Sequence, residues 1–399
     1  MGGLIDLKKV RITAYILLLV LIFNVAFINI TVCTAEDEIN ISSKSAYLVE
    51  ADSGRVLYEK DALKEMAPAS ITKIMTLLLI FEALDLGNIK MEDKVRVSAH
   101  AASMGGSQVF LEENEEQTVE DMIKCISIAS ANDACVAMAE YISSSEEAFV
   151  KKMNERAKEL GMNNTNFVNC CGLDVENHYS CAKDIAIMGM ELMKKYPEIS
   201  KYATTWQDSI FHTNRKGEKK EFGLTNTNKL VRTYNGITGL KTGSTSDAGY
   251  CLCASSERNG MKMVAVVMSA VDHKSRFSEC AKLMDYGYSQ CQLYVDEEDY
   301  SKILSEISVK GSISGKLECE WQPFKYVLAG KEVNENIEKE IIFKDDYIAP
   351  INSGDEVGYI KYSILGKEIG EVSIKSSVEV EKSSYKDYLI KAVHILFKV

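Results

Sequence analysis

The spacing of apolar and polar residues divides the first part of the chain into a strand hairpin followed by helices. Residues 46–58 alternate as two half-buried strands do, and Asp-Ser-Gly at 52–54 supplies the residues of a tight turn. The next apolar run, over residues 71–86, is continuous enough to predict a buried helix. Ser70 comes at the start of this run, where a serine side chain can cap the helix.

Helical spacing recurs further along, and one strand pair lies among the helices. Helices are predicted over residues 120–142, with a break at 130–133, and over 149–160, 182–195 and 275–288. Two strands joined at 258–260 are predicted over residues 239–269. This order lacks the regular alternation of strand and helix that a parallel sheet requires.

The pattern changes near Cys291, after which short alternating segments replace the helices. They are separated by Gly, Asn and Asp, and two of them cover residues 356–364 and 371–375. Strands of this length with such turn residues predict a small all-β domain, which we place at residues 300–380. The larger domain that precedes it then covers residues 36–290.

The last segment, residues 383–399, has the spacing of an amphipathic helix with a wide apolar face. The polar residues on its other face are Asp387, Lys391, His394 and Lys398. The segment is too short to span a bilayer, and we expect it to lie in a membrane interface with its lysines near the headgroups. A terminal helix docked on the β domain is the alternative.

The N-terminus has the order of a secretory signal. Lys8, Lys9 and Arg11 precede an apolar run over residues 12–30, and small residues follow at 33–35. We therefore expect a signal peptide over residues 1–35 and an exported protein. Because the run is nearly long enough to span a bilayer, an uncleaved membrane anchor is the alternative.

Composition narrows the classes of partner and cofactor. The formal net charge is −12, which argues against nucleic-acid binding because such a chain repels phosphate. Of the eleven cysteines, two are adjacent at 170–171, and no paired Cys-x-x-Cys motif occurs. We expect mostly free, buried thiols. The five histidines are scattered and no His-Glu-x-x-His motif is present, so we expect no metal.

The first candidate for chemistry is Ser70-Ile71-Thr72-Lys73. Residues three apart share one face of a helix, so the Lys73 amine is expected to stand beside the Ser70 hydroxyl. A serine is a poor nucleophile until a base takes its proton, and a lysine kept neutral is such a base. The motif alone is weak, because Ser383 and Lys386 have the same spacing.

Two further motifs add a proton relay and a binding strand. Ser130 supplies a second hydroxyl, and the Asn132 amide can both donate to and accept from a substrate amide. In the strand-like segment that follows, Lys241 supplies a positive charge and the Thr242 hydroxyl can bind a carboxylate. Gly243 has no side chain and allows a substrate backbone to approach closely.

Together, in this order and in an exported chain, the three motifs are those of penicillin-binding proteins and class A β-lactamases. The chain resembles the low-molecular-weight penicillin-binding proteins, specifically the serine-type D-alanyl-D-alanine carboxypeptidases of peptidase family S11. Beyond the motifs, the resemblance includes residues 68–76, 128–135, 166–174 and 239–250. It implies an α/β (α+β) serine acyl-transferase domain with an antiparallel sheet flanked by helices, then a small all-β domain and an amphipathic helix.

The resemblance also implies the reaction. Ser70 attacks the carbonyl between the two D-alanines of a peptidoglycan stem peptide, and Lys73 accepts its proton. Ser130 relays a proton to the departing D-alanine, and water then releases the shortened peptide. The backbone N–H groups of Ser70 and Ser244 form the oxyanion hole. β-Lactam antibiotics are expected to acylate the same serine as inhibitors, and no cofactor is required.

Substrate binding is implied for the remaining motif residues. Asn132 holds a substrate amide, and Lys241, Thr242 and Gly243 hold the chain that ends in the terminal carboxylate. Arg276 falls where the family places an arginine that binds this carboxylate. The implied location is the outer face of the cytoplasmic membrane and the cell wall, with peripheral attachment through the terminal helix.

The chain departs from the family pattern at two places. Ala131 stands where relatives often have glycine, and since it is small we expect little effect. The Cys-Cys pair at 170–171 stands where relatives often have a proline-containing pair, which leaves the shape of that loop open.

Three other functions share these motifs. A class A β-lactamase needs a Glu-x-x-Leu-Asn segment, whereas residues 159–163 read Glu-Leu-Gly-Met-Asn. A catalytically inactive protein that binds wall peptides or β-lactams would not need the full set of motif residues found here. A transpeptidase uses the same acyl-enzyme, and the motifs do not distinguish its amine acceptor from water.

Overall fold

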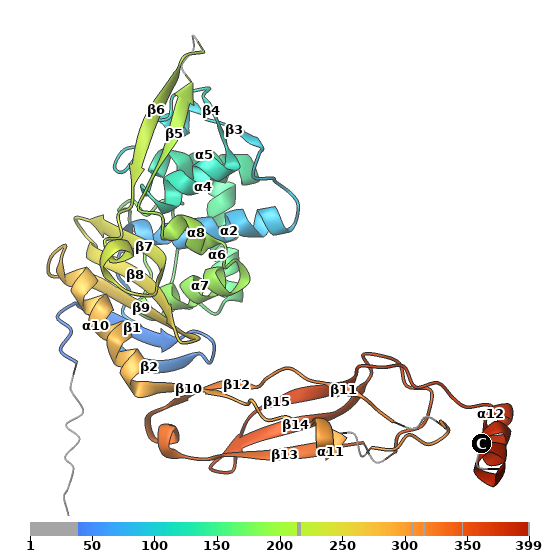
Figure 1. Ribbon diagram of the computed structural model, residues 1–399. Helices are drawn as coiled ribbons and strands as arrows, with labels where there is room; N and C mark the ends of the chain where they lie inside the picture. Colours follow the sequence, from blue (N-terminus) through green and yellow to red (C-terminus); the bar gives the residue numbers. More distant parts are fainter. Residues whose placement is uncertain (1–38, 214–216, 305–306, 314–315, 345, 398–399) are drawn as a thin grey trace, which may run out of the picture. The chain divides into compact units, whose positions relative to one another are not determined.

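The computed structural model describes residues 39–213, 217–304, 307–313, 316–344 and 346–397. The predicted signal segment, residues 1–35, lies outside this part of the chain. The described helices and strands follow one another as Figure 1 shows.

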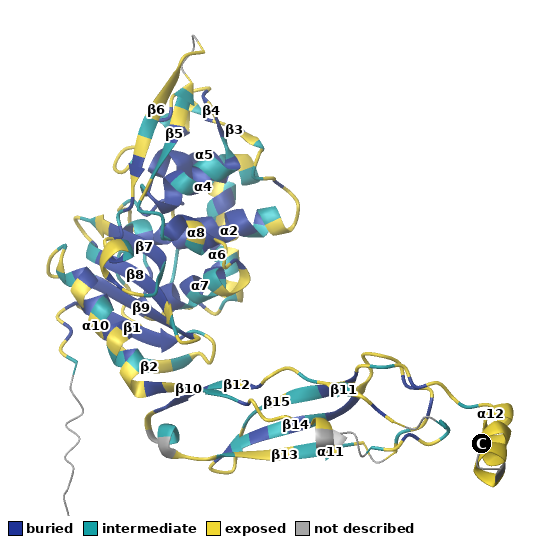
Figure 2. Ribbon diagram, viewed as in Figure 1, coloured by how far each residue is buried: buried dark blue, intermediate teal, exposed yellow. Residues whose placement is uncertain are grey.

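A five-stranded sheet forms the base of the larger domain, with strand order β2-β1-β9-β8-β7 (Figure 1). Its strands are β1 (Ser45–Glu50), β2 (Arg55–Lys60), β7 (Ile237–Thr245), β8 (Gly249–Arg258) and β9 (Met261–Ala270). Every adjacent pair is antiparallel, so the N-terminal hairpin joins strands from the far end of the domain. Runs of consecutive residues in β8 and β9 are buried, which shows that both faces are covered (Figure 2).

Helices cover the two faces of this sheet. The main helices are α2 (Lys73–Asp85), α4 (Val119–Ser127), α5 (Asn132–Ser143), α6 (Glu146–Glu159), α7 (Ala182–Lys195) and α10 (Ser275–Gln290). Gly287 of α10 packs against Met263 of β9, and Gly189 of α7 packs against Val264, the next residue of the strand. Because adjacent strand residues point to opposite faces, α10 and α7 lie on opposite sides. The predicted antiparallel sheet flanked by helices is confirmed.

The predicted buried helix is present, but its start differs from the prediction. A 3-10 turn, η1 (Ala69–Thr72), precedes α2, and the α-helix begins at Lys73. Thr72 occupies the N-cap position, and no side chain caps this helix, so the prediction that Ser70 caps it is wrong. The Ser70 hydroxyl instead accepts a hydrogen bond from Lys73. α2 packs against α4, α5 and α7 and buries nearly all of its residues, as predicted.

The segment at 239–269, predicted as two strands, belongs to three. β7 and β8 are joined by a turn at residues 246–248, while β8 and β9 meet at the predicted turn. The first turn reads Ser-Asp-Ala, without proline or glycine, and only Gly249 after it adopts a positive φ of 66°. The apolar pattern therefore continued across a turn that has weak sequence signals.

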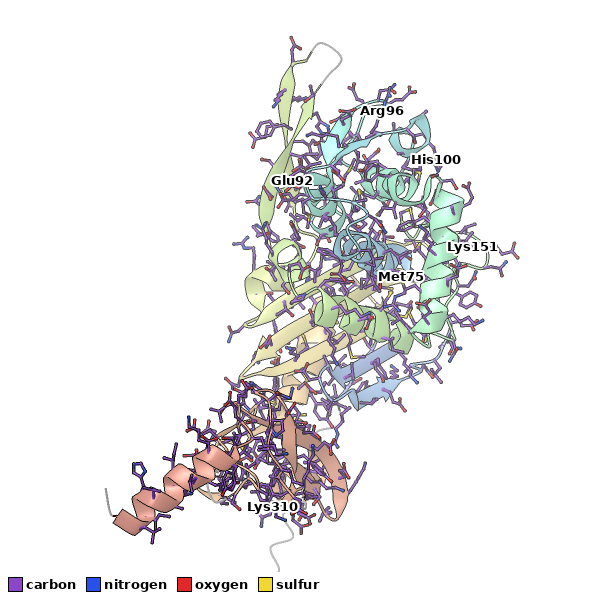
Figure 3. The ribbon with its side chains drawn as sticks, turned by 90° about the vertical axis from the view of Figure 1, so that its right-hand side faces the viewer. Met75, Glu92, Arg96, His100, Lys151 and Lys310 are labelled. Carbon is purple, nitrogen blue, oxygen red and sulfur yellow. The ribbon has the colours of Figure 1, made fainter. Side chains whose placement is uncertain are left out.

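Smaller elements complete the larger domain, and the sequence analysis predicted none of them. They are β3 (Lys94–Arg96), α3 (Ala99–Ala102), β4 (Glu116–Thr118), α8 (Ile199–Ala203), β5 (Gln207–Thr213), β6 (Lys219–Thr225) and α9 (Leu230–Thr233). β3 pairs with β4, and β5 pairs with β6, as two separate antiparallel ribbons. The predicted surface helix is confirmed as α6, whose Lys151 points away from the domain (Figure 3).

The C-terminal part is all-β, as predicted. A four-stranded antiparallel sheet has the order β11-β15-β14-β13, and β10 pairs with β12 in a second ribbon. The strands are β10 (Cys291–Val295), β11 (Cys319–Glu320), β12 (Lys325–Ala329), β13 (Ile337–Phe343), β14 (Glu356–Ile364) and β15 (Lys367–Ser376). Short helical turns are α11 (Ser301–Leu304) and η2 (Gly330–Asn334). The core has its own aromatic centre, where the Phe324 and Tyr362 rings stack with centroids 3.9 Å apart.

The predicted terminal helix is present as α12 (Tyr385–Phe397). Its apolar residues up to Leu396 are exposed to solvent, as the yellow ribbon of Figure 2 shows, and Leu396 itself is 77% exposed. Within the described residues, no helix has the length and apolar character needed to cross a membrane.

Candidate active site

The nucleophile candidate Ser70 is held between two glycine-bearing segments. The backbone of β7 approaches from one side, where a Cβ on Gly243 would lie 2.9 Å from the carbonyl oxygen of Pro68. A loop approaches from the other side, where a Cβ on Gly172 would lie 1.9 Å from the carbonyl oxygen of Ala69. The sequence analysis assigned the close approach at Gly243 to a substrate; in this structure the chain's own serine segment makes it.

Lys73 connects the first two motifs. It is completely buried, and its Nζ lies 2.9 Å from Ser70 Oγ and 2.6 Å from Asn132 Oδ1. A third hydrogen bond, of 2.7 Å, goes to the backbone carbonyl of Cys171, which the sequence analysis missed. The Asn132 and Cys171 oxygens hold the amine at hydrogen-bond distance from Ser70 Oγ, which is the distance that proton transfer from serine to a general base requires. Met75, two residues further along α2, lies in the domain interior (Figure 3).

Ser130 and Asn132 lie on the turn from α4 to α5. Ser130 is buried with φ at +64°, an uncommon conformation for a residue other than glycine. Asn132 begins α5; its backbone N–H donates to the Ser107 carbonyl at 2.7 Å, and its Nδ2 donates to the Gly105 carbonyl at 2.7 Å. The amide oxygen is thereby directed at Lys73.

The next residue, Asp133, holds the loop at residues 105–111, which also contacts Asn132. The sequence analysis missed this residue as well. Its buried carboxylate accepts hydrogen bonds from the backbone N–H groups of Val109 and Leu111, each at 3.1 Å. Burial raises the pKa of Asp133, and these backbone hydrogen bonds oppose that shift. A lone aspartate after the second motif carries no sequence signal of this role, since its partners are backbone groups.

The third motif lies on β7, and its charged residue is buried. Lys241 Nζ donates to the backbone carbonyl of Thr242 at 3.0 Å, and Thr242 Oγ1 donates to Thr227 Oγ1 at 2.7 Å. Burial lowers the pKa of Lys241 well below its ordinary value, and the nearby cations Lys73 and Arg276 lower it further. An anion bound here would reverse this effect by stabilising the ammonium form.

Arg276 contacts the third motif directly. Its Nη1 donates to the Gly243 carbonyl at 3.1 Å, while the buried Nε has no hydrogen-bond partner in the described part of the chain. The guanidinium lies over the rings of Tyr250 and Phe277, with centroid distances of 5.7 and 4.8 Å. The His273 ring packs edge-on against both rings, a contact that sequence reasoning missed. Burial lowers the pKa of Arg276.

Ser244 occupies the exposed end of β7, opposite Tyr250 of β8. The adjacent Thr245 donates to the Asp174 carboxylate at 2.7 Å. The end of the strand is therefore tied to the loop that carries Gly172, so that both segments beside Ser70 are connected.

The ten cysteines in the described residues are all free, and nine of them are buried. The prediction of free, buried thiols is confirmed for these residues. Two of them, Cys170 and Cys171, form part of the loop beside Ser70, where the carbonyl of Cys171 binds Lys73.

A serine and a lysine in hydrogen-bond contact, joined by an asparagine and flanked by a Lys-Thr-Gly strand, define a serine acyl-transferase site on a penicillin-binding protein fold. The chain belongs to the D-alanyl-D-alanine carboxypeptidase family, whose sequence profile matches residues 31–272. Residues 321–382 match the C-terminal domain of penicillin-binding protein 5.

Similarity to known proteins extends along most of the chain. D-alanyl-D-alanine carboxypeptidase DacF of Bacillus subtilis (strain 168) is 45% identical over 356 residues, which are 88% of this chain and 89% of the relative. Penicillin-binding protein 5 of Haemophilus influenzae superposes with a TM-score of 0.66 at 28% identity, covering 86% of this chain and 98% of that one. A peptidoglycan synthesis regulatory factor of Streptococcus pneumoniae superposes with a TM-score of 0.70 at 25% identity, covering 86% and 100%.

These similarities confirm the predicted family, the fold and the class of enzyme, a serine-type D-alanyl-D-alanine carboxypeptidase. Members of this penicillin-binding family act on peptidoglycan peptides and bind β-lactams, in agreement with the predicted kind of substrate and inhibitor.

Proposed function

We propose that this chain removes the terminal D-alanine from peptidoglycan pentapeptides through an acyl-enzyme on Ser70. The observation that carries the proposal is the contact of Lys73 Nζ with Ser70 Oγ at 2.9 Å, inside a buried site that Asn132 completes. Such a site couples a nucleophile directly to its base.

The reaction follows from this contact. As Ser70 Oγ forms a bond to the carbonyl carbon, its proton passes to Lys73. The backbone N–H groups of Ser70 and Ser244 receive the negative charge on the carbonyl oxygen. Collapse breaks the C–N bond, and Ser130 passes the proton from Lys73 to the leaving amine. Water then hydrolyses the ester, returning Ser70 and releasing the shortened peptide.

Recognition of the terminal carboxylate is assigned to the third motif and Arg276, with Asn132 on the peptide amide. Lys241 and Arg276 are both buried, and burial lowers the pKa of each. A carboxylate placed between Lys241, Thr242 and Arg276 would compensate two buried cations and offer an acceptor to Arg276 Nε. Gly243, which has no side chain, lets this strand lie directly against the segment that carries Ser70.

Glu159, at the end of α6, argues against the β-lactamase alternative. Its side chain is 66% exposed and forms an ion pair of 3.2 Å with Arg156, and the three groups that Lys73 contacts include no carboxylate. A deacylating carboxylate like that of class A enzymes therefore has no counterpart at this segment or at Lys73. A penicillin adduct is expected to persist.

For location, we propose an exported protein with a signal segment at residues 1–35, a catalytic domain at 36–290, a β domain at 300–380 and a membrane-associating helix at 383–399. Separate family matches at residues 31–272 and 321–382 support the two domains. The exposed apolar residues of α12 support peripheral attachment at the outer face of the membrane.

The test is the release of D-alanine from a Lys-D-Ala-D-Ala peptide by the purified chain, with intact mass measured after addition of penicillin. We expect D-alanine release and a long-lived adduct, both lost in Ser70→Ala. An adduct that forms and quickly disappears as penicillin is consumed, without release of D-alanine, would identify a β-lactamase. An unchanged ligand affinity in Ser70→Ala, with no turnover in the wild type, would identify a binding protein.

A further inference from the structure

The contact between Lys73 and the Cys171 carbonyl depends on a loop that lies outside any helix or strand. The carbonyl accepts the Lys73 amine at 2.7 Å, and the residue after it, Gly172, lies against the backbone of Ala69 and Ser70. One peptide unit, from Cys171 to Gly172, therefore faces both the base and the nucleophile segment. Its orientation has to be fixed by something other than regular secondary structure.

The Asn169 side chain supplies this restraint. Its Oδ1 accepts the Gly172 N–H at 2.7 Å and the N–H groups of Cys171 and Leu173 at 3.2 Å each. Its Nδ2 donates to the Leu173 carbonyl at 2.9 Å. Asparagine is suited to this task because its side chain reaches the backbone of the residues that follow it.

The direction of these hydrogen bonds matters for Lys73. In a trans peptide the carbonyl and the N–H lie in one plane and point in opposite directions. The Gly172 N–H that Asn169 holds belongs to the same peptide plane as the Cys171 carbonyl that Lys73 holds. Asn169 thus binds the N–H and Lys73 binds the carbonyl of one rigid peptide unit, and rotation of that unit would break both hydrogen bonds.

We propose that Asn169 is a positioning residue for acyl transfer, which acts on Lys73 through the Cys171–Gly172 peptide. The inference rests on the proposed function and adds a residue to which none of the three motifs points. Without Asn169, the carbonyl rotates away, and Lys73 loses one of the two acceptors, Asn132 Oδ1 and the Cys171 carbonyl, that direct its amine at Ser70. The serine segment loses its support at the same time, because Gly172 moves with the peptide.

Asn154 offers a matched control, because its side chain holds the backbone of the same loop at an earlier residue. From α6, its Nδ2 donates to the Phe167 carbonyl at 2.8 Å and its Oδ1 accepts the Phe167 N–H at 2.8 Å. It therefore restrains the backbone as Asn169 does, but two residues upstream and with no bond to the peptide that faces Lys73. Asn154→Ala should lower the melting temperature without impairing the chemical step.

The experiment measures kcat and KM for the Lys-D-Ala-D-Ala peptide, the rate of penicillin adduct formation, and the melting temperature. For Asn169→Ala we expect kcat and the acylation rate to fall about 100-fold, the cost typical of a misplaced reacting group, with KM changed by less than about threefold. Asn169→Asp keeps the Oδ1 acceptor and should recover most of the rate. Asn169→Gln keeps an amide but displaces it by one methylene, and should stay impaired.

The outcomes separate cleanly. Acylation at the wild-type rate in folded Asn169→Ala or Asn169→Gln would overturn the proposal. So would a loss no greater than that in Asn154→Ala at an equal drop in melting temperature, since Asn169 would then serve stability alone. If Asn169→Ala does not fold, the contrast between Asn169→Asp and Asn169→Gln decides. If the wild type and Asn154→Ala also fail to release D-alanine, it is the proposed function that fails.

Discussion

At the residue scale, the spacing of Ser70 and Lys73 brings the nucleophile and its base into contact, although a 3-10 turn joins them and the α-helix begins only at Lys73. Residues three apart face one side in a 3-10 turn as well as in an α-helix, so the 2.9 Å contact survives the difference. The contact with the Cys171 carbonyl could not be predicted, because every residue type has a backbone carbonyl and the sequence does not show which one is used. Asn169 and Asp133 were missed for the same reason: their partners are backbone N–H groups.

Gly172 leads to a prediction at this scale. Its φ is +88°, and a Cβ would lie 1.9 Å from the Ala69 carbonyl oxygen and 2.9 Å from Ser70 N. Gly172→Ala must therefore displace the serine segment, and we expect acylation by penicillin to fall about 100-fold or more. Backbone strain should also lower the free energy of unfolding by roughly 1–3 kcal/mol. Intact mass against time and thermal melting measure the two effects.

Gly161→Ala provides the control for Gly172→Ala. Gly161 has a similar φ of +74°, but a Cβ there meets nothing within 4 Å. The substitution should cost comparable backbone strain while leaving the acylation rate at the wild-type value. Equal losses of acylation in the two variants would show that general destabilisation, and not the contact with the serine segment, is responsible.

At the scale of elements, long periodic segments were predictable and connections were not. The helix at 182–195 matches α7 at both ends, because its apolar spacing continues for its full length. The β5–β6 ribbon was missed, although it spans residues Gln207–Thr213 and Lys219–Thr225, because its exposed polar residues hide the alternation. The loop at 105–111 was also missed, since hydrogen bonds to Asn132 and Asp133 hold it in place of an apolar pattern.

The terminal helix α12 carries the prediction for this scale. Deletion of residues 383–399 should release the exported protein from membranes and leave D-alanine release unchanged. Replacing Leu389 and Val393 by Asp in the full chain should weaken binding to anionic lipid vesicles at least about tenfold, because two exposed apolar side chains lose their insertion free energy. Sedimentation with vesicles measures both changes.

Asp387→Ser, on the polar face of the same helix, is the control and should keep membrane binding. If the deleted form still sediments with membranes, the N-terminal apolar segment is the anchor and α12 is not. If the Leu389 and Val393 substitutions leave binding unchanged, the apolar face of α12 does not enter the membrane.

At the scale of the whole molecule, the change of pattern near Cys291 indicated a second folding unit. The described residues of the larger domain include an extended apolar core, and the β domain has a separate core around residues such as Phe324, Tyr362 and Ile374. The core of the β domain also contains a buried carboxylate, Asp296, with hydrogen bonds to Tyr300, Lys339 and Tyr362. Sequence pattern alone could not identify this polar group, because its members are widely separated along the chain. Two domains with separate cores are expected to give two thermal transitions, since multidomain chains seldom unfold in one step.

Asp296 gives a means of separating these transitions. Its side chain is only 3% exposed and accepts hydrogen bonds from Tyr300, Tyr362 and Lys339 at 2.6, 2.7 and 2.8 Å. Burial opposes ionisation, but the bonds from Lys339 and the two tyrosines outweigh it and hold the pKa of Asp296 at about 2. A carboxyl with a depressed pKa in the folded state stabilises it above the unfolded pKa, and this contribution is lost as the pH falls towards 2.

Asp296→Asn should therefore lower only the transition of the β domain, by a free energy of roughly 2–3 kcal/mol at neutral pH, because a buried charged acceptor of three bonds is replaced by a neutral amide. The difference from the wild type should shrink as the pH is lowered from about 4, where the unfolded aspartate begins to bind protons, to about 2. Calorimetry at a series of pH values measures this, with penicillin acylation as a check on the catalytic domain.

A pH-independent difference would mean that Asp296 acts through packing and not through its charge. A shift of both transitions together, with acylation lost, would mean that the two cores unfold as one cooperative unit.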